Sequence, residues 1–163
     1  MSKRIGSGAA LLAGALAVTG LVFAPSASAA VSPTSATITA SCGIFGGGTA
    51  TLTATQSATD PTAATMTLTS SAITTPLALN QNSIASTLTM VNNTGPNRVF
   101  SGSVNPAMSA GSSITVGPLP GTVAVGDSLT FNGGSLKMVI LGITITCTTA
   151  TGTSQTPGPF VFS

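Results

Sequence analysis

Apolar and polar residues alternate along most of the chain beyond residue 30. In the segment 49–55, Ala50, Leu52 and Ala54 alternate with four threonines. A period of two places successive side chains on opposite faces of a β-strand, so one face is expected to be buried and the other hydrated. The same alternation predicts further strands at 35–42, 65–69, 87–90, 100–104, 114–116, 129–131 and 137–147.

Turn-forming residues separate these runs. Asn132-Gly133-Gly134 is a strong tight-turn signal and predicts a hairpin after Phe131. Gly142 predicts a bulge or bend within a last long strand that is buried on both faces near 138–141, with Lys137 reaching out at its end. Other breaks are predicted at 43–48 ("GIFGGG"), 60–61 ("DP"), 92–97 ("NNTGPN") and 117–121 ("GPLPG", a rigid connector).

The pattern predicts an all-β fold of about eight short strands. An antiparallel β-sandwich is the first expectation, and a small closed β-barrel is the alternative. Abundant threonine, valine and isoleucine agree with this class, because branching at Cβ favours extended chain. We expect the domain to span 30–150 and to be followed by a polar C-terminal tail, 151–163, whose end is either a short last strand or loose.

Residues 1–29 have the layout of a helical signal peptide. Lys3 and Arg4 precede an apolar run at 9–24, and Ala27 and Ala29 occupy the small positions of a cleavage site, so cleavage is expected after Ala29. The alternative is a retained anchor, but the run is shorter than the roughly 20 residues that a span needs. We therefore expect no permanent membrane span after cleavage, and a location that is secreted, extracellular or loosely associated with the cell wall.

Removal of the signal peptide changes the charge balance. The full chain carries a net charge of +2, but without Lys3 and Arg4 two basic residues, Arg98 and Lys137, balance two acidic ones. Nucleic-acid partners are excluded, because phosphate binding needs clustered lysine and arginine. A net charge near zero removes the usual repulsion between copies and favours association of the protein with itself.

The two cysteines, Cys42 and Cys147, predict one disulfide in an exported chain. In the chain-entropy model, a bridge that closes about 100 residues contributes roughly 4.7 kcal/mol to stability. A reactive thiol or a metal site is disfavoured, because the chain has no histidine to activate a thiol or to complete a ligand set.

The inventory of chemical groups argues against an enzyme. Asp60 precedes a proline and Asp127 follows a glycine, so both are expected to bond local backbone amides in turns. Lys137 lies in no S-x-x-K motif. We expect no catalytic, metal or cofactor site. The sequon "NNT" at 92–94 is interpreted only as an exposed loop.

Three stretches carry a resemblance to a family: "TITASCGIFG" with Cys42, "GTVAVGDSLTF", and "ITITCT" with Cys147. Together with the exported N-terminus, they resemble a domain of unknown function found in secreted, threonine-rich, two-cysteine β proteins from actinobacteria. The resemblance covers about 34–149. It implies secretion and a β-sandwich, and it transfers no active residues.

The function expected from these features is a non-catalytic structural or adhesion domain at the cell envelope. It would associate with itself or with envelope components through sheet edges that little charge protects. The alternative is a carrier of a small apolar ligand between the sheets; an enclosed apolar cavity of several hundred Å³ would favour it, and a filled core would favour adhesion. The candidate lining of that carrier site is Met66, Met90, Phe100, Phe131 and Met138.

The threonine ranks are either a plain solvent face or a third, remote possibility, ice or glycan binding. An ice-binding face needs a flat stack of strands, whereas free sheets twist, and we expect these ranks to be divided between two sheets. The residues of the possible binding face are Thr49, Thr51, Thr53, Thr55, Thr65, Thr67 and Thr69.

Overall fold

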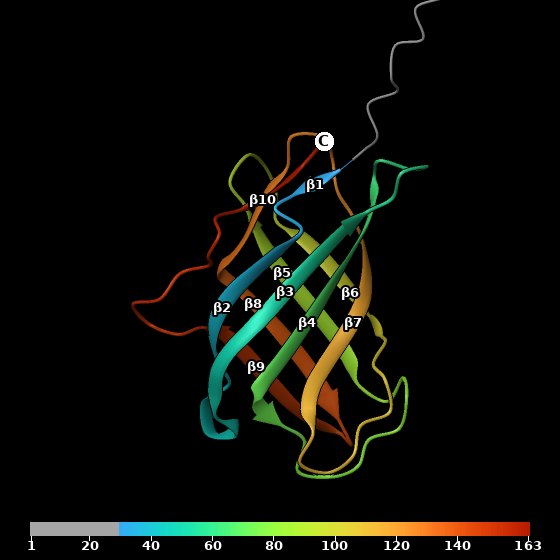
Figure 1. The fold of residues 1–163 in the computed structure, drawn as a ribbon, viewed down its shortest axis with the longest axis vertical. Helices are drawn as coiled ribbons and strands as arrows, with labels where there is room; N and C mark the ends of the chain where they lie inside the picture. Colours follow the sequence, from blue (N-terminus) through green and yellow to red (C-terminus); the bar gives the residue numbers. More distant parts are fainter. Residues whose placement is uncertain (1–29) are drawn as a thin grey trace, which may run out of the picture.

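The computed structural model describes residues 30–163, which form ten strands and one 3₁₀ turn (Figure 1). The predicted signal peptide, 1–29, and its cleavage site lie outside the described residues. The elements are β1 (Val31–Ser32), β2 (Ser35–Ser41), η1 (Gly43–Phe45), β3 (Gly47–Gln56), β4 (Ala63–Thr74), β5 (Ala85–Asn92), β6 (Arg98–Ser103), β7 (Ser113–Thr122), β8 (Ser128–Ile140), β9 (Ile143–Thr149) and β10 (Phe160–Phe162).

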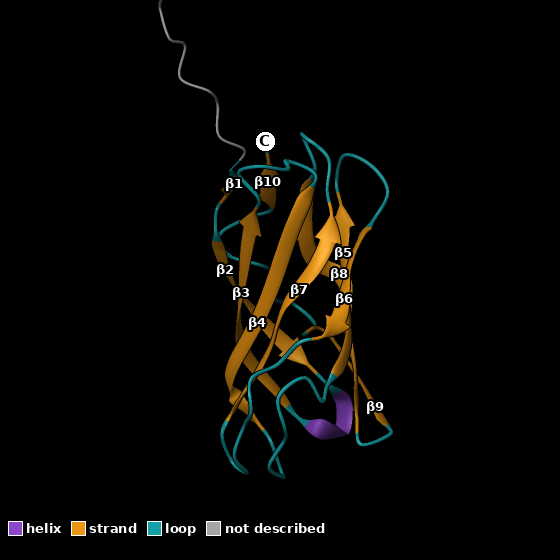
Figure 2. Ribbon diagram, turned by 90° about the vertical axis from the view of Figure 1, so that its right-hand side faces the viewer, coloured by secondary structure: helices purple, strands orange, loops and turns teal. Residues whose placement is uncertain are grey.

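The sheet closes on itself into an eight-stranded antiparallel barrel. The strand order is β8-β5-β6-β7-β4-β3-β2-β9, and β9 pairs again with β8. Closure is possible because β8, which is 13 residues long, pairs with β5 along one side and with β9 and β10 along the other. The all-β prediction is confirmed, and its arrangement is the closed barrel that stood as the alternative to the sandwich (Figures 1 and 2).

The C-terminal segment ends in the short strand β10, which is one of the two alternatives expected for the end of the polar tail at 151–163. Phe160 and Phe162 of β10 are buried, and β10 lies between β1 and β8. Gln155 is also buried, and its side-chain oxygen accepts a hydrogen bond of 2.9 Å from the Phe131 amide. The tail looked polar because its apolar residues are few and come last, yet they contribute to the core.

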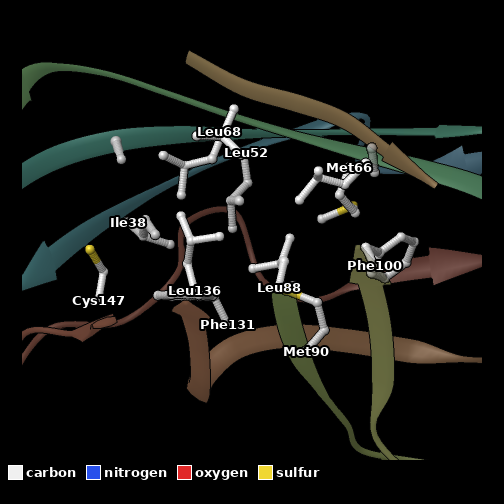
Figure 3. Packing of buried hydrophobic residues seen from close by; sticks show 14 of the residues in the cluster. Ile38, Leu52, Met66, Leu68, Leu88, Met90, Phe100, Phe131, Leu136 and Cys147 are labelled. Carbon is white, nitrogen blue, oxygen red and sulfur yellow. The ribbon is translucent and has the colours of Figure 1, made fainter. Parts of the chain in front are cut away.

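The barrel interior is filled by the apolar side chains of the alternating strands, which point inward. Ala50, Leu52 and Ala54 of β3 are buried, as expected. Met66, Met90 and Phe100 are fully buried among aliphatic side chains from both walls (Figure 3). Alternating small and large inward residues let the opposite walls approach each other and exclude water.

In the last long segment, the structure has a bulge where a turn was predicted and a turn where a bulge was predicted. Residues 131–134 stand opposite the single residue Met90 and form a bulge within β8, not a hairpin turn. A Cβ on Gly134 would collide with the backbone oxygen of Thr89, so glycine is needed there for close approach. The hairpin turn is Leu141-Gly142, which joins β8 to β9 with φ of 50° and 82°. The local signal "NGG" failed because a bulge and a tight turn both use glycine at positive φ.

The "GPLPG" segment is part of β7 and not a connector. Gly117 and Pro118 stand opposite the single residue Thr67, which makes a second bulge. Gly117 has φ of 116°, and a Cβ there would lie 2.6 Å from the carbonyl oxygen of Met66. Proline is tolerated in a strand at such a bulge.

The predicted disulfide between Cys42 and Cys147 is confirmed, with a Cα–Cα distance of 4.0 Å. It joins the residue after β2 to the middle of β9. These two strands share the register pairs Ala40↔Thr149 and Ser41↔Thr148. The covalent bond therefore reinforces a short seam of the barrel.

Candidate functional site: an apolar pocket at one end of the barrel

A pocket of about 290 Å³ opens at the end of the barrel opposite the C-terminus. η1 lies at this end beside β9 (Figure 2). Residues from six parts of the chain line the pocket: the end of β2 with η1, the end of β4, the β4–β5 loop, the start of β7, the end of β8, and β9. They are Cys42, Ile44, Phe45, Ile73, Thr74, Thr75, Pro76, Leu77, Leu79, Ile114, Met138, Ile140, Leu141, Ile143 and Ile145.

The up-and-down strand order explains why these residues meet. β2, β4 and β8 all run toward the same end, so the segments that follow them, η1, the β4–β5 loop and the β8–β9 turn, are gathered there. Inward residues near the strand ends, such as Ile114 and Met138, form the floor. The pocket is the space that the core side chains leave beneath these connections.

The rim of this pocket exposes large apolar side chains to solvent. Ile44 is 96% exposed and Leu141 is 72% exposed. Five of the eight exposed large apolar residues of the described chain lie here, although turns are usually polar. We call these five the apolar rim: Ile44, Phe45, Leu77, Leu141 and Ile143.

Leu141 is also placed against backbone preference. Its φ of 50° lies in the left-handed region, which costs a non-glycine residue roughly 1 to 2 kcal/mol. A type I′ turn favours asparagine at this position. Because the side chain is 72% exposed, its packing contacts contribute little stabilisation to offset this backbone cost. An exposed apolar residue that is kept in a backbone conformation it disfavours indicates a role other than folding.

The pocket offers almost no polar chemistry. The Thr75 hydroxyl donates a hydrogen bond of 2.7 Å to the carbonyl oxygen of Ser109, so it is already satisfied. Among the residues that line the pocket, none has an ionisable side chain, since Cys42 is in the disulfide. Such a site can desolvate an apolar group but supplies no acid, base or nucleophile.

The titratable residues considered for catalysis are dispersed. The Asp60 carboxylate accepts hydrogen bonds from the Thr62 hydroxyl at 2.7 Å and the Thr62 amide at 2.9 Å, and both lower its pKa. This is the local turn role that we predicted. Lys137 is exposed on the outer wall of β8, opposite Thr87 and Thr146 of the neighbouring strands. Neither residue lines the pocket.

Asp127 connects three segments at the end of the barrel that carries the C-terminus. Its carboxylate accepts bonds from Arg98 Nε, the Asn92 side chain at 2.8 Å and the Ala124 amide at 2.7 Å. Burial raises the pKa of Asp127, but the bonds from Arg98, Ala124 and Asn92 and the charge of Arg98 lower it by more. The acceptor Asn92 of the "NNT" sequon is buried in this network, so the expected exposed loop does not present that side chain.

The threonine ranks of β2, β3 and β4 form one continuous array on adjacent strands, which corrects our expectation that they would be divided between two sheets; the ranks at 87/89 and 144/146 lie elsewhere, on β5 and β9. In-register pairs include Thr37↔Thr51, Thr51↔Thr69 and Thr53↔Thr67, so rows of hydroxyls and methyls cross adjacent strands. The array extends from β2 across β3 and β4 to β7. Its members are Thr37, Thr39, Thr49, Thr51, Thr53, Thr55, Thr65, Thr67, Thr69 and Thr115.

Of the five side chains expected to line a carrier site, Met138 alone lines the pocket. Met66, Met90, Phe100 and Phe131 belong to the filled core. Sequence reasoning missed the rim for three reasons. It interpreted the segment around Ile44 only as a glycine-rich break, and it made no prediction for the segment around Leu77. It placed Leu141 in a strand buried on both faces near 138–141, which is wrong, because Leu141 is exposed in the turn that follows β8. Each of these three connections contains an apolar residue, and that was the overlooked signal. The up-and-down strand order then places all three connections at one end of the barrel.

Comparison of the chain with family models, with curated proteins and with solved structures found no match. Within residues 30–163, no helix is long and apolar enough to cross a bilayer.

Proposed function

We propose that the protein is an exported, non-catalytic binding protein that holds a small apolar molecule in the pocket at the end of the barrel. The observation that carries the proposal is a pocket of about 290 Å³ whose lining is apolar and whose rim leaves apolar side chains exposed. Its volume is roughly twice that of an apolar cavity of about 150 Å³ that binds benzene.

Three further features support this assignment. The disulfide agrees with an oxidising location such as the cell exterior. The barrel core is filled, so the pocket belongs to the end of the barrel and is not a general packing defect. Its lining provides no charged group to orient a polar substrate, which favours a neutral, apolar ligand.

A titration with the neutral fluorescent probe N-phenyl-1-naphthylamine tests the proposal. We expect saturable 1:1 binding to the wild type. Ile145→Trp, which fills the pocket from β9, should weaken binding at least tenfold. The matched control is Val99→Trp, on the exposed outer wall of β6, and it should retain affinity. Absence of saturable binding, or equal loss in both variants with the fold preserved by circular dichroism, would contradict the proposal.

A second candidate is adhesion to glycans of the cell envelope through the threonine array. The observation that favours it is the in-register rows on β2, β3 and β4. Barrel strands twist and tilt, so the rows fan out and fit a flexible hydroxylated chain better than a planar ice face. Association through sheet edges has less support, because within residues 30–163 each strand of the closed barrel has neighbours on both sides and only the two-residue β1 has a single partner.

Sedimentation with the insoluble cell-wall fraction tests this second candidate. A triple variant, Thr51→Val, Thr53→Val and Thr67→Val, removes hydroxyls from the centre of the array without changing side-chain shape. It should abolish co-sedimentation, whereas Thr87→Val with Thr146→Val on the opposite wall should not. If the triple variant still sediments with the wall, the array is a plain solvent face.

A further inference from the structure

Three of the four charged side chains of residues 30–163 lie at one end of the barrel, and five of the eight exposed large apolar side chains lie at the other. Asp60, Arg98 and Asp127 lie in or beside the loops at the end that carries the C-terminus. The five residues of the apolar rim lie at the other end. The rim end therefore carries most of the exposed large apolar side chains of residues 30–163, and both aspartates lie at the other end.

Lys137 is the exception to this segregation. It is exposed on β8, three residues before that strand ends at Ile140 and four before Leu141 of the rim. The described chain shows one ion pair, Arg98–Asp127, so Lys137 lacks a partner within residues 30–163. At about 3.3 Å per residue and a strand tilt near 40°, its Cα lies roughly 8 to 10 Å above the rim.

We propose that the apolar rim docks on a lipid surface and that Lys137 contacts its anionic headgroups. Apolar segments that rest on a bilayer insert about 5 to 10 Å at the boundary between headgroups and acyl chains. A rim inserted to that depth places Lys137 at the level of the lipid phosphates. Lys137 places one positive charge at headgroup height, and neither aspartate of residues 30–163 lies at this end. This charge complementarity favours an anionic lipid surface over a second copy of the chain.

The shape of the rim agrees with this occupant. Ile44, Leu77 and Leu141 come from three separate connections. Their side chains are therefore distributed around the mouth of the pocket and do not form one flat patch. Such separate side chains can enter a fluid interface independently, whereas a dimer needs complementary packing between copies. The strained backbone of Leu141 is then explained by a leucine retained for insertion.

Docking and ligand binding are separable. The proposed function can fail while the rim still binds lipid, because probe binding requires the pocket interior and docking requires the rim. Ile145→Trp fills the pocket from inside and should leave vesicle binding unchanged. Docking also provides a route by which an apolar molecule could pass between a bilayer and the pocket without crossing water.

Vesicle flotation tests the inference. The protein is purified from cells that express the full chain, and its mass is measured. It is then floated with vesicles of phosphatidylcholine alone or of phosphatidylcholine mixed with phosphatidylglycerol. We expect wild type and Ile145→Trp to bind, with preference for the anionic vesicles. Leu141→Asn should weaken binding about tenfold. Val125→Asn is the matched control, because Val125 is also 72% exposed but lies at the opposite end, and it should have no effect.

Lys137→Gln tests the headgroup contact separately. It should weaken binding to the anionic vesicles about fivefold and leave binding to phosphatidylcholine unchanged. The inference is overturned if wild type binds neither vesicle, if Leu141→Asn and Val125→Asn behave alike, or if Lys137→Gln has no effect. A dimer that Leu141→Asn dissociates, without vesicle binding, would show that the rim is an interface between copies and would also overturn it.

Discussion

At the scale of single residues, Asp127 organises the charged end of the barrel. Its carboxylate holds Arg98 at the start of β6, Asn92 at the end of β5 and the Ala124 amide. The buried Asn92 in turn accepts hydrogen bonds from the Ser128 and Thr94 amides. One carboxylate therefore fixes two loops relative to each other.

Asp127→Asn should destabilise the protein by about 2 to 3 kcal/mol. The amide keeps the shape of the side chain but leaves Arg98 without its carboxylate and removes one charged acceptor. Urea unfolding at pH 7 measures the difference. Asp60→Asn is the control, because the Asp60 carboxylate is exposed and bonds the exposed Thr62, and we expect a much smaller loss there. Equal losses would contradict the role given to the buried network.

The stability that Asp127 provides should depend on pH in a defined direction. Its pKa is lowered in the folded state, so the contribution is fully present above the unfolded pKa of about 3.9. It is lost as pH falls through the lower folded-state pKa. Unfolding curves from pH 7 to 2.5 should therefore converge for wild type and Asp127→Asn at the acid end. A difference that stays constant across this range would show that the carboxylate charge is not involved.

Leu141→Asn should stabilise the protein by about 0.5 to 1 kcal/mol. Asparagine adopts a φ of 50° more readily than leucine does, and the lost side chain is 72% exposed. The midpoint of urea unfolding checks this. If the variant is less stable, Leu141 contributes to folding, and its position on the rim loses its functional interpretation.

At the scale of elements, alternation predicted the strands well but left their connections undecided. Ala50, Leu52 and Ala54 face inward as expected because a period of two is imposed by the pleat. Gly133 and Gly142 both have positive φ, and sequence alone could not tell that the first makes a bulge and the second a turn. That choice depends on which strand lies beside each glycine, which is a property of the assembled barrel.

The bulge in β8 can be tested by a matched pair of glycines. Gly134→Ala should destabilise the protein by about 2 to 4 kcal/mol, because the new methyl would overlap the backbone oxygen of Thr89. Gly158→Ala should change stability by less than about 0.5 kcal/mol, since a Cβ there meets nothing within 4 Å. Thermal unfolding distinguishes the two. A tolerated Gly134→Ala would be inconsistent with the close approach of β5 to β8.

The candidate site was less predictable than the fold for a related reason. A pocket needs several connections to meet at one place, and that meeting follows from the order of the strands. Met138 was expected among the lining of a carrier site, whereas Ile44 was interpreted as part of a turn and Leu77 lay in a segment with no predicted element. The threonine array was likewise seen as separate ranks, because register between strands cannot be deduced from any one of them.

At the scale of the whole molecule, the barrel is closed by backbone pairing and by one covalent bond at the β2–β9 seam. Replacing both Cys42 and Cys147 by serine should lower the free energy of unfolding by roughly 3 to 5 kcal/mol, because the bridge spans 105 residues. Wild type treated with dithiothreitol should match the double variant in urea unfolding. An unchanged midpoint would show that β2 and β9 hold together without the bond.

The central claim is that the end of the barrel, and not its filled middle, receives an apolar molecule. The most direct measurement is methyl NMR of the isoleucine and methionine side chains during titration with cyclohexane. We predict saturable shifts for the pocket methyls of Ile73, Ile114, Ile145 and Met138. The core methyls of Met66 and Met90 should remain unchanged. Shifts centred on the core methyls, or no saturable shift at the pocket, would contradict the account.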